Sequence, residues 1–355
     1  MLFVSIIIAF AFTSLATDDP ELPCLSEQNS PNQNIGLKID IWYGRHQRFG
    51  HLGISQRWIN IVGNVSSKDS VTECFYILNN RPAQPFQLGP DLHRLAKAGD
   101  FNLDLALTTL EEGENRLIIS VISGSRQVND TVFLQISKEA KWPIPYEVDF
   151  TVVDNLQDVI QVVDGNWNLT KEGVRTVEPY YDRVFCIGDT SWQNYEALVK
   201  LTVHDWTPSQ PGPPTYNVSH FGIAMHWRGH HEDGNQPRRK WYPLGAQGEF
   251  LLKEKSDSCH WRILFDGKNP DKPPIYASGF NSIKKNRIIW VKSQVRNVEN
   301  GNTVYKFKQW LDGQEEPAEW NLEGTEKGDY SSGSLCIVPH NSDVTIHQVK
   351  IDPIF

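Results

Sequence analysis

The sequence predicts an all-β protein built from two antiparallel β-sandwiches, a smaller one followed by a larger one. Short apolar runs recur from Gly36 to the C-terminus, and turn residues separate them. In the second half of the chain no convincing helical pattern interrupts these runs. The chain of 355 residues is also too long for one ordinary hydrophobic core. We therefore expect two domains.

The composition is that of a globular protein with no general affinity for nucleic acid. Hydrophobic residues make up 39% of the chain and charged residues 22%. The formal net charge of −9 opposes binding to phosphate backbones. The sequence has no phosphate-cradling glycine loop, dinucleotide fingerprint or G-x-S-x-G motif. Nucleotide-dependent chemistry is therefore excluded, and any basic site must be local.

The N-terminus predicts secretion. Residues 1–16 form an apolar run that ends in small residues, which is typical of a signal peptide, and residues 17–35 form a polar lead-in. The run is too short for a membrane anchor, and no later segment could span a bilayer, so we expect no membrane insertion. Four acceptor sequons predict a glycoprotein with modified side chains at Asn64, Asn129, Asn168 and Asn217.

Five cysteines would remain after signal removal, and in an oxidising compartment an odd number leaves one unpaired or paired between chains. Cys24 and Cys74 are one candidate disulfide pair. Cys186 and Cys336 are a second, because each lies in a strand-like run. The sequence leaves the pairing, the odd cysteine and the oligomeric state open.

The first domain is expected over residues 36–138. Six apolar runs with turns between them are typical of an immunoglobulin-like β-sandwich. Residues 139–153 are predicted as a linker, because Pro143 and Pro145 enforce an extended chain there. The second domain then covers residues 154–355, and its ten or more apolar runs predict a large antiparallel sandwich.

Several motifs of the second domain point to one superfamily. They are Asp164-Gly165-Asn166-Trp167, then Trp192 to Glu196 before a long strand, the segment Phe307 to Trp320, and the closing strand Asp343 to Ile346. Their order resembles the concanavalin A-like lectin and glucanase superfamily, including laminin-G-like jelly rolls. This resemblance implies a jelly roll whose ligand lies across a concave sheet. It does not imply a function, because the fold hosts lectins, hydrolases, lyases and structural modules.

The stretch from His220 to Gly245 holds the densest chemistry in the chain, with four histidines and two tryptophans. Read as a strand, it places Phe221, Ile223, Met225 and Trp227 on one face and His226, Arg228 and His230 on the other. Two later strands also alternate polar and apolar residues. Together these strands would present cationic and aromatic groups to an acidic polysaccharide. The predicted ligand-binding residues are His226, Arg228, His230, Arg238, Trp241, Lys292, Gln294, Arg296 and Lys308.

Other functions stay open beside non-catalytic glycan binding. A polysaccharide lyase could use Tyr305 or His226 for proton transfer, with Arg228 and Gln309 neutralising a uronate carboxylate. A glycoside hydrolase is less favoured, since the strand at Glu147 lacks the second carboxylate that such enzymes need. The chain could also be an extracellular structural module with no glycan ligand, so whether it is an enzyme is undecided.

Metal binding is expected to be at most structural, and no cofactor is required. Acidic residues in loops and at strand starts are candidate calcium ligands, with Asp164 and Asp343 foremost and Asp189 and Asp329 beside them. His226, His230 and His231 are weak candidates for zinc, because their spacing suits a helix and the local alternation does not.

Overall fold

The computed structural model describes residues 36–206, 218–233, 245–265, 272–327 and 330–355. The predicted signal peptide and lead-in lie outside these ranges, as do Cys24, Asn217, Arg238, Trp241 and Asp329. The described chain is made of β-strands with a few short 3-10 turns, which confirms the predicted all-β class. No helix within it has the length and apolar character needed to cross a membrane.

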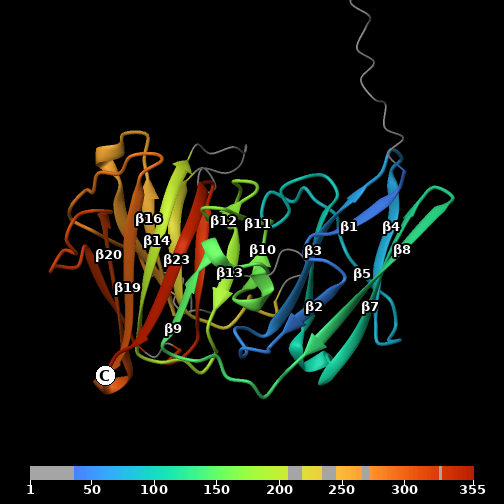
Figure 1. The fold of residues 1–355 in the computed structure, drawn as a ribbon, viewed down its shortest axis with the longest axis horizontal. Coiled ribbons are helices and arrows are strands. Elements are labelled where there is room, and N and C mark those ends of the chain that lie inside the picture. The colour runs from blue at the N-terminus through green and yellow to red at the C-terminus, as the bar shows by residue number, and fades with distance from the viewer. Residues whose placement is uncertain (1–35, 207–217, 234–244, 266–271, 328–329) are drawn as a thin grey trace, which may run out of the picture. The chain divides into compact units, whose positions relative to one another are not determined.

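The smaller sandwich packs a three-stranded sheet, in the order β1-β3-β6, against a five-stranded sheet, in the order β2-β8-β7-β4-β5 (Figure 1). Alternate side chains of β7, such as Leu117, Ile119 and Val121, are fully buried in the core between these sheets. The immunoglobulin-like topology stays a prediction. The strands are β1 Lys38–Ile41, β2 His46–Phe49, β3 Trp58–Ser66, β4 Val71–Leu78, β5 Gln84–Pro85, β6 Asp100–Ala106, β7 Gly113–Ser123 and β8 Arg126–Ile136.

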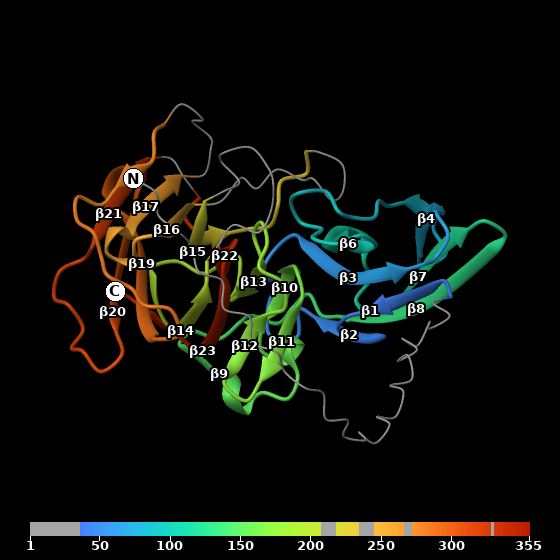
Figure 2. The same cartoon turned by 90° about the horizontal axis from the view of Figure 1, so that it is seen from above.

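The larger sandwich packs a seven-stranded sheet, in the order β10-β13-β22-β15-β16-β17-β18, against an eight-stranded sheet, in the order β11-β12-β23-β14-β19-β20-β21 (Figure 2). One apolar core fills the space between them. The strands are β9 Tyr146–Asp149, β10 Gln161–Asp164, β11 Trp167–Thr170, β12 Gly173–Thr176, β13 Val184–Ile187, β14 Tyr195–Asp205, β15 Ser219–Trp227, β16 Ala246–Leu252, β17 His260–Phe265, β18 Ile275–Tyr276, β19 Ile288–Val298, β20 Asn302–Leu311, β21 Leu322–Lys327, β22 Ser334–His340 and β23 Asp343–Pro353.

The predicted linker is wrong in its second half. Tyr146–Asp149 forms β9, which pairs antiparallel with β23 and extends the eight-stranded sheet. Val148 is buried in the core of the larger sandwich. The extended conformation that the prolines favour therefore continues directly into a strand, and the second sandwich begins earlier than residue 154.

Strand β15 departs from the simple alternation that its sequence predicts. Phe221, Ile223 and Met225 point into the core between the sheets, as expected. The pairing register with β22 then shifts between Met225 and Trp227, and His226 takes a left-handed φ of 56°. This bulge reverses the faces that follow it. Trp227 packs beside Ala224 on the outer face of the seven-stranded sheet, the face turned away from the eight-stranded sheet.

The cysteines and sequons are only partly accounted for. Cys186 and Cys336 lie directly opposite each other on β13 and β22, with their sulfur atoms 2.9 Å apart, and both are free thiols here. The disulfide between them stays a prediction. Asn129 and Asn168 are exposed, whereas the side-chain amide of Asn64 donates hydrogen bonds to Asp100 and to the carbonyl of Ala98.

Candidate functional site

The three strands predicted to share one ligand face belong to two different sheets. Strand β15 lies in the seven-stranded sheet, while β19 and β20 lie in the eight-stranded sheet. Ser293, Val295 and Phe307 of these two strands are fully buried, so their polar neighbours face outward from the eight-stranded sheet. The predicted continuous surface is therefore wrong. Its residues are divided between sheets whose exposed faces point in opposite directions.

The polar residues of β19 and β20 form ion pairs and hydrogen bonds with their own neighbours. The Lys292 ammonium lies 2.9 Å from Glu196 and 3.2 Å from Glu316. The Lys308 ammonium lies 2.7 Å from Glu316 and donates a hydrogen bond to the carbonyl of Pro317. Gln294 donates to Glu196, and Arg296 donates to the carbonyl of Phe355. This arrangement is typical of an outer sheet face whose cations are already neutralised.

The His226 side chain lies among the buried aromatic rings between the sheets. One ring nitrogen, Nδ1, lies 2.7 Å from the carbonyl of Tyr330, and burial lowers the pKa of the imidazole to about 4. Its ring meets Tyr195 and Tyr305 at centroid distances of 6.0 and 6.1 Å. Arg228 stacks over Tyr330 at 5.0 Å. The structure thus brings two of the four proposed lyase residues together, but His226 and Tyr305 have no exposed surface.

Gln309, the fourth residue proposed for a lyase, is also buried, at 5% exposure. It follows Phe307 on the inner side of β20, and its backbone N–H donates a hydrogen bond to Asn321. No hydrogen bond or ring contact found among the described residues joins it to His226. The predicted quartet is therefore not assembled as one site here.

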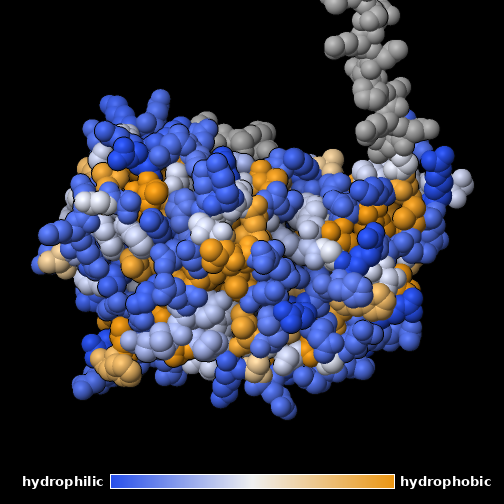
Figure 3. Space-filling model, in the orientation of Figure 1, coloured by the Kyte–Doolittle hydropathy of each residue, from blue (hydrophilic) through white to orange (hydrophobic). Residues whose placement is uncertain are grey.

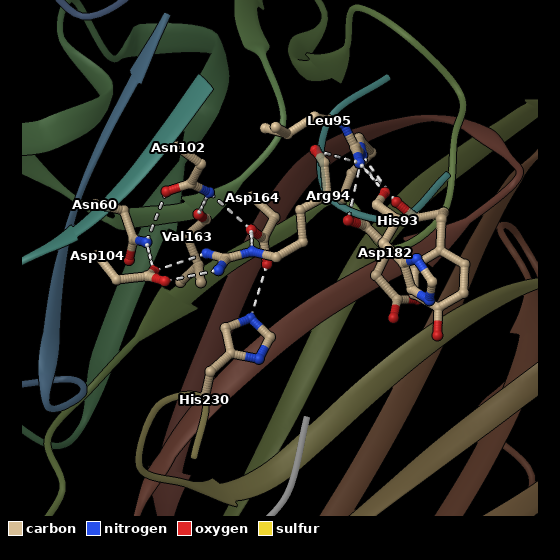
Figure 4. A network of polar contacts seen from close by, with 12 residues as sticks. Asn60, His93, Arg94, Leu95, Asn102, Asp104, Val163, Asp164, Asp182 and His230 are labelled. Atoms are coloured by element: carbon tan, nitrogen blue, oxygen red, sulfur yellow. Dashed lines mark hydrogen bonds and ion pairs between the residues drawn. The ribbon is translucent and has the colours of Figure 1, made fainter. Parts of the chain in front are cut away.

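His230 belongs to a buried polar network between the two sandwiches (Figure 4). Its Nε2 lies 2.9 Å from the Asp164 carboxylate, and the indole of Trp58 donates a 2.6 Å hydrogen bond to the His230 carbonyl. Arg94 lies between Asp164 and Asp104 and forms an ion pair with each. The prediction of His230 as a glycan ligand loses its basis, because the residue lies under the first sandwich.

The structure shows what the predicted calcium ligands contact. Burial by itself would raise the pKa of Asp164, but Arg94 and His230 outweigh burial and lower that pKa to about 2. Asp343 is held by Arg175 through two hydrogen bonds of 2.9 and 2.6 Å. Asp189 accepts hydrogen bonds from the backbone of Ile54 and from Ser191. Asp164 and Asp343, the two foremost candidates, are therefore paired with the guanidinium groups of Arg94 and Arg175. This corrects their prediction as calcium ligands.

A different set of residues gathers on the outer face of the seven-stranded sheet. His220 and His340 are direct partners in the pairing of β15 with β22, and their rings stack at 4.8 Å with an interplanar angle of 12°. The Asp182 carboxylate, just before β13, lies 2.7 Å from Nδ1 of His340. Gly222 makes room for the His220 ring, since a Cβ there would lie 3.2 Å from its Nδ1.

Glu249 and Arg262 continue this set across β16 and β17. The Glu249 carboxylate lies 3.5 Å from Nε2 of His220 and accepts a 2.7 Å hydrogen bond from Nε of Arg262. Gln247 donates a further hydrogen bond to Glu249. Burial raises the pKa of Glu249 against the opposing effect of Arg262. Burial also lowers the pKa of His220 well below its usual range, with help from His340 and Arg262.

The set reaches solvent at the edge formed by β18. Tyr276 pairs directly with Arg262 and is 52% exposed, and the nearby Phe280 is 68% exposed. The His260 ring contacts both, at 6.1 and 5.5 Å. The face of the molecule drawn in Figure 3 carries apolar patches among hydrophilic residues. We call this set the sheet row and define it as Tyr276, Arg262, Glu249, His220, His340 and Asp182.

Sequence reasoning missed the sheet row although part of its signal was present. His220, Glu249 and Arg262 each sit beside core residues in their strands, which is the period-two pattern of a strand with a polar outer face. His220 also shares its face of β15 with the small residues Gly222 and Ala224. The partners of His220 on other strands could not be predicted, because the order of strands in a sheet does not follow from periodicity.

Comparisons with known proteins do not assign the chain to a family. No family model matches it, and no curated protein matches it. Among solved structures, the Ca²⁺-bound exoplasmic/lumenal domain of VIP36 is 10% identical, with 59% of this chain and 89% of that chain covered and a TM-score of 0.36.

Two enzymes show likenesses of the same order. An endo-β-1,4-glucuronan lyase from the fungus Trichoderma reesei is 10% identical, with 59% of this chain and 95% of that chain covered and a TM-score of 0.36. An endo-β-1,4-mannanase from Thermotoga petrophila is 10% identical, with 32% of this chain and 22% of that chain covered and a TM-score of 0.24. No functional argument rests on likenesses of this size.

Proposed function

We propose that this protein binds a carbohydrate polymer across the outer face of the seven-stranded sheet, along the sheet row. The observation that carries the proposal is the continuity of the row. Each member contacts the next, from exposed Tyr276 at the edge to buried His340 and half-buried Asp182. Aromatic rings can stack on the apolar faces of sugars, and fixed polar groups can orient their hydroxyls.

An acidic polysaccharide is the ligand class we propose. The half of the row that reaches solvent presents Arg262 and the ring of Tyr276, and the rings of His260 and Phe280 lie next to it. The carboxylates of Glu249 and Asp182 lie deeper and are already paired with Arg262 and His340. Although Arg262 is itself paired with Glu249, a carboxylate or sulfate on the polymer would meet its guanidinium and the exposed aromatic rings first. We further propose that the protein is secreted and glycosylated, which residues 1–16 and the exposed sequons at Asn129 and Asn168 support.

The test is glycan-array binding of the wild-type protein and two variants. Removing the exposed Tyr276 ring (Tyr276→Ala) should weaken binding about tenfold, the equivalent of about 1.4 kcal/mol, while the fold is preserved. Lys292→Ala is the matched control, since it lies on the outer face of the other sheet. Loss of binding in Lys292→Ala alone would move the site to the eight-stranded sheet. Failure of the wild-type protein to bind any glycan would favour a structural module.

A polysaccharide lyase is the second candidate. The observation that favours it is the contact between the rings of His226 and Tyr305, two groups able to transfer protons. Nε2 of His226 is buried and has no hydrogen-bond partner among the described residues. Because both side chains are buried, this activity would require the sheets to separate locally, and binding is therefore the better-supported function. Ultraviolet absorbance of unsaturated uronate, lost in His226→Ala, would establish the lyase.

A further inference from the structure

Asp182, His220 and His340 form a cluster whose chemistry exceeds what glycan binding needs. The ligand atoms that these three side chains can offer all lie within 4.8 Å of one another. His220 and His340 are 3% and 5% exposed, so the cluster is largely shielded from water. The stacked imidazoles come from adjacent strands, and the carboxylate comes from the loop before β13. Three elements therefore converge on one point.

Two ring nitrogens of this cluster are buried without a partner. Nδ1 of His220 and Nε2 of His340 have no hydrogen bond among the described residues. Buried polar atoms are nearly always paired, so an unpaired nitrogen calls for an explanation such as a bound water or ion. Gly222 keeps the space beside Nδ1 of His220 open, because a Cβ at that position would lie 3.2 Å from this atom and 3.0 Å from the carbonyl of Val338.

The partner of the other ring nitrogen of His220 resembles the outer shell of a metal site, while Asp182 lies beside His340 as a second possible ligand. Glu249 lies 3.5 Å from Nε2 of His220, and Asp182 lies 2.7 Å from Nδ1 of His340. The Glu249 carboxylate beside Nε2 fixes the tautomer of His220 and leaves its Nδ1 as a ligand. The Asp182 distance is also close to the separation of about 3 Å expected between two ligands that share one ion at bonds of about 2 Å.

We propose that Asp182, His220 and His340 bind one divalent transition-metal ion of the zinc class. Two imidazoles and one carboxylate are the donor set that zinc, cobalt and nickel accept, whereas calcium takes oxygen ligands only. The ion would occupy the buried end of the sheet row, with Glu249 orienting His220. This inference does not depend on glycan binding, because the cluster stands on its own contacts.

Metal titration of the full chain after chelator treatment tests the proposal. Co²⁺ should bind with one equivalent per chain and give visible absorption bands, and Zn²⁺ should displace it. His340→Ala and Asp182→Asn should each weaken binding at least about tenfold, because each removes one ligand of the ion. His204→Ala is the matched control, since its ring contacts Asn286 and Thr345 elsewhere, and it should bind as the wild type does.

Each other outcome overturns the proposal. Binding that survives in Asp182→Asn and His340→Ala would place the ion elsewhere, and absence of stoichiometric Co²⁺ and Zn²⁺ binding would mean that no such site exists. Binding of Ca²⁺ in preference to Zn²⁺ would refute the metal class. Circular dichroism of Asp182→Asn, the mildest change, separates loss of the ligand from loss of the fold. Glycan-array binding in the presence of chelator tests the proposed function separately.

Discussion

At the scale of single residues, the most consequential group is Asp164. Its carboxylate is fully buried and lies beside the Arg94 guanidinium and the His230 imidazole. Because its pKa is lowered to about 2 in the folded protein, it stabilises the fold at pH values above its ordinary pKa of 3.8. That stabilisation is lost as the pH falls from about 4 through 2, and the shift corresponds to about 2 kcal/mol.

Asp164→Asn should therefore lower the free energy of unfolding at pH 7 by at least about 2 kcal/mol, and the deficit should shrink towards pH 2. Urea unfolding at several pH values would measure this change. Asp40→Asn is the control, because that carboxylate is 59% exposed and its nearest cation is 3.9 Å away, and its curve should run parallel to that of the wild type. A gap for Asp164→Asn that stays constant with pH would contradict the assigned role.

At the scale of elements, the bulge in β15 depends on Gly333, which directly precedes the neighbouring strand β22. A Cβ on Gly333 would lie only 2.2 Å from the His226 carbonyl carbon and 2.5 Å from its Cα. Gly333→Ala should cost about 1 to 3 kcal/mol of stability, because backbone on both sides must shift. Gly279→Ala, where a Cβ would meet nothing within 4 Å, should be near neutral. Thermal unfolding of both variants checks this, and equal melting temperatures would refute it.

Strand β15 also shows how far periodicity reaches. Alternation correctly places Phe221, Ile223 and Met225 in the core, because side chains of a regular strand point to opposite faces. It fails at His226, since a bulge adds one residue and the pattern of residue types is unchanged by it. The face of Trp227 could therefore not be predicted from its own strand.

The candidate site was even less accessible to prediction. Periodicity gives the face that Lys292 occupies relative to the core, but not which of two sheets its strand joins. Likewise, His340 lies far from His220 in the sequence and reaches it only through the pairing of β22 with β15. The contact between Arg94 and Asp164 could not be predicted for the same reason. It joins the two sandwiches, and periodicity within one strand does not reveal contacts between domains.

At the scale of the whole molecule, two hydrophobic cores are joined by polar contacts. The described residues belong to one compact unit although the two sandwiches have separate cores. The outer face of β3 and β6 explains why the two sandwiches form one unit. Asn60, Asn102 and Asp104 alternate with core residues there. Asn102 donates to Asp164, Asp104 accepts from Arg94, and Asn60 donates to both Asn102 and Asp104. Both faces of these strands are therefore buried, and we expect the sandwiches to unfold together.

Arg94→Ala should divide this cooperative unit. It leaves the carboxylates of Asp104 and Asp164 buried without their shared cation, which typically costs about 3 to 5 kcal/mol. Differential scanning calorimetry should show one transition for the wild type and two for the variant. Arg48→Ala is the control. Its ion pair with Asp158 also joins the sandwiches, but it is exposed and contributes less than about 1 kcal/mol, so one transition should remain. A single transition in Arg94→Ala would mean that other contacts, such as the hydrogen bond from the Trp58 indole to the His230 carbonyl, couple the sandwiches instead.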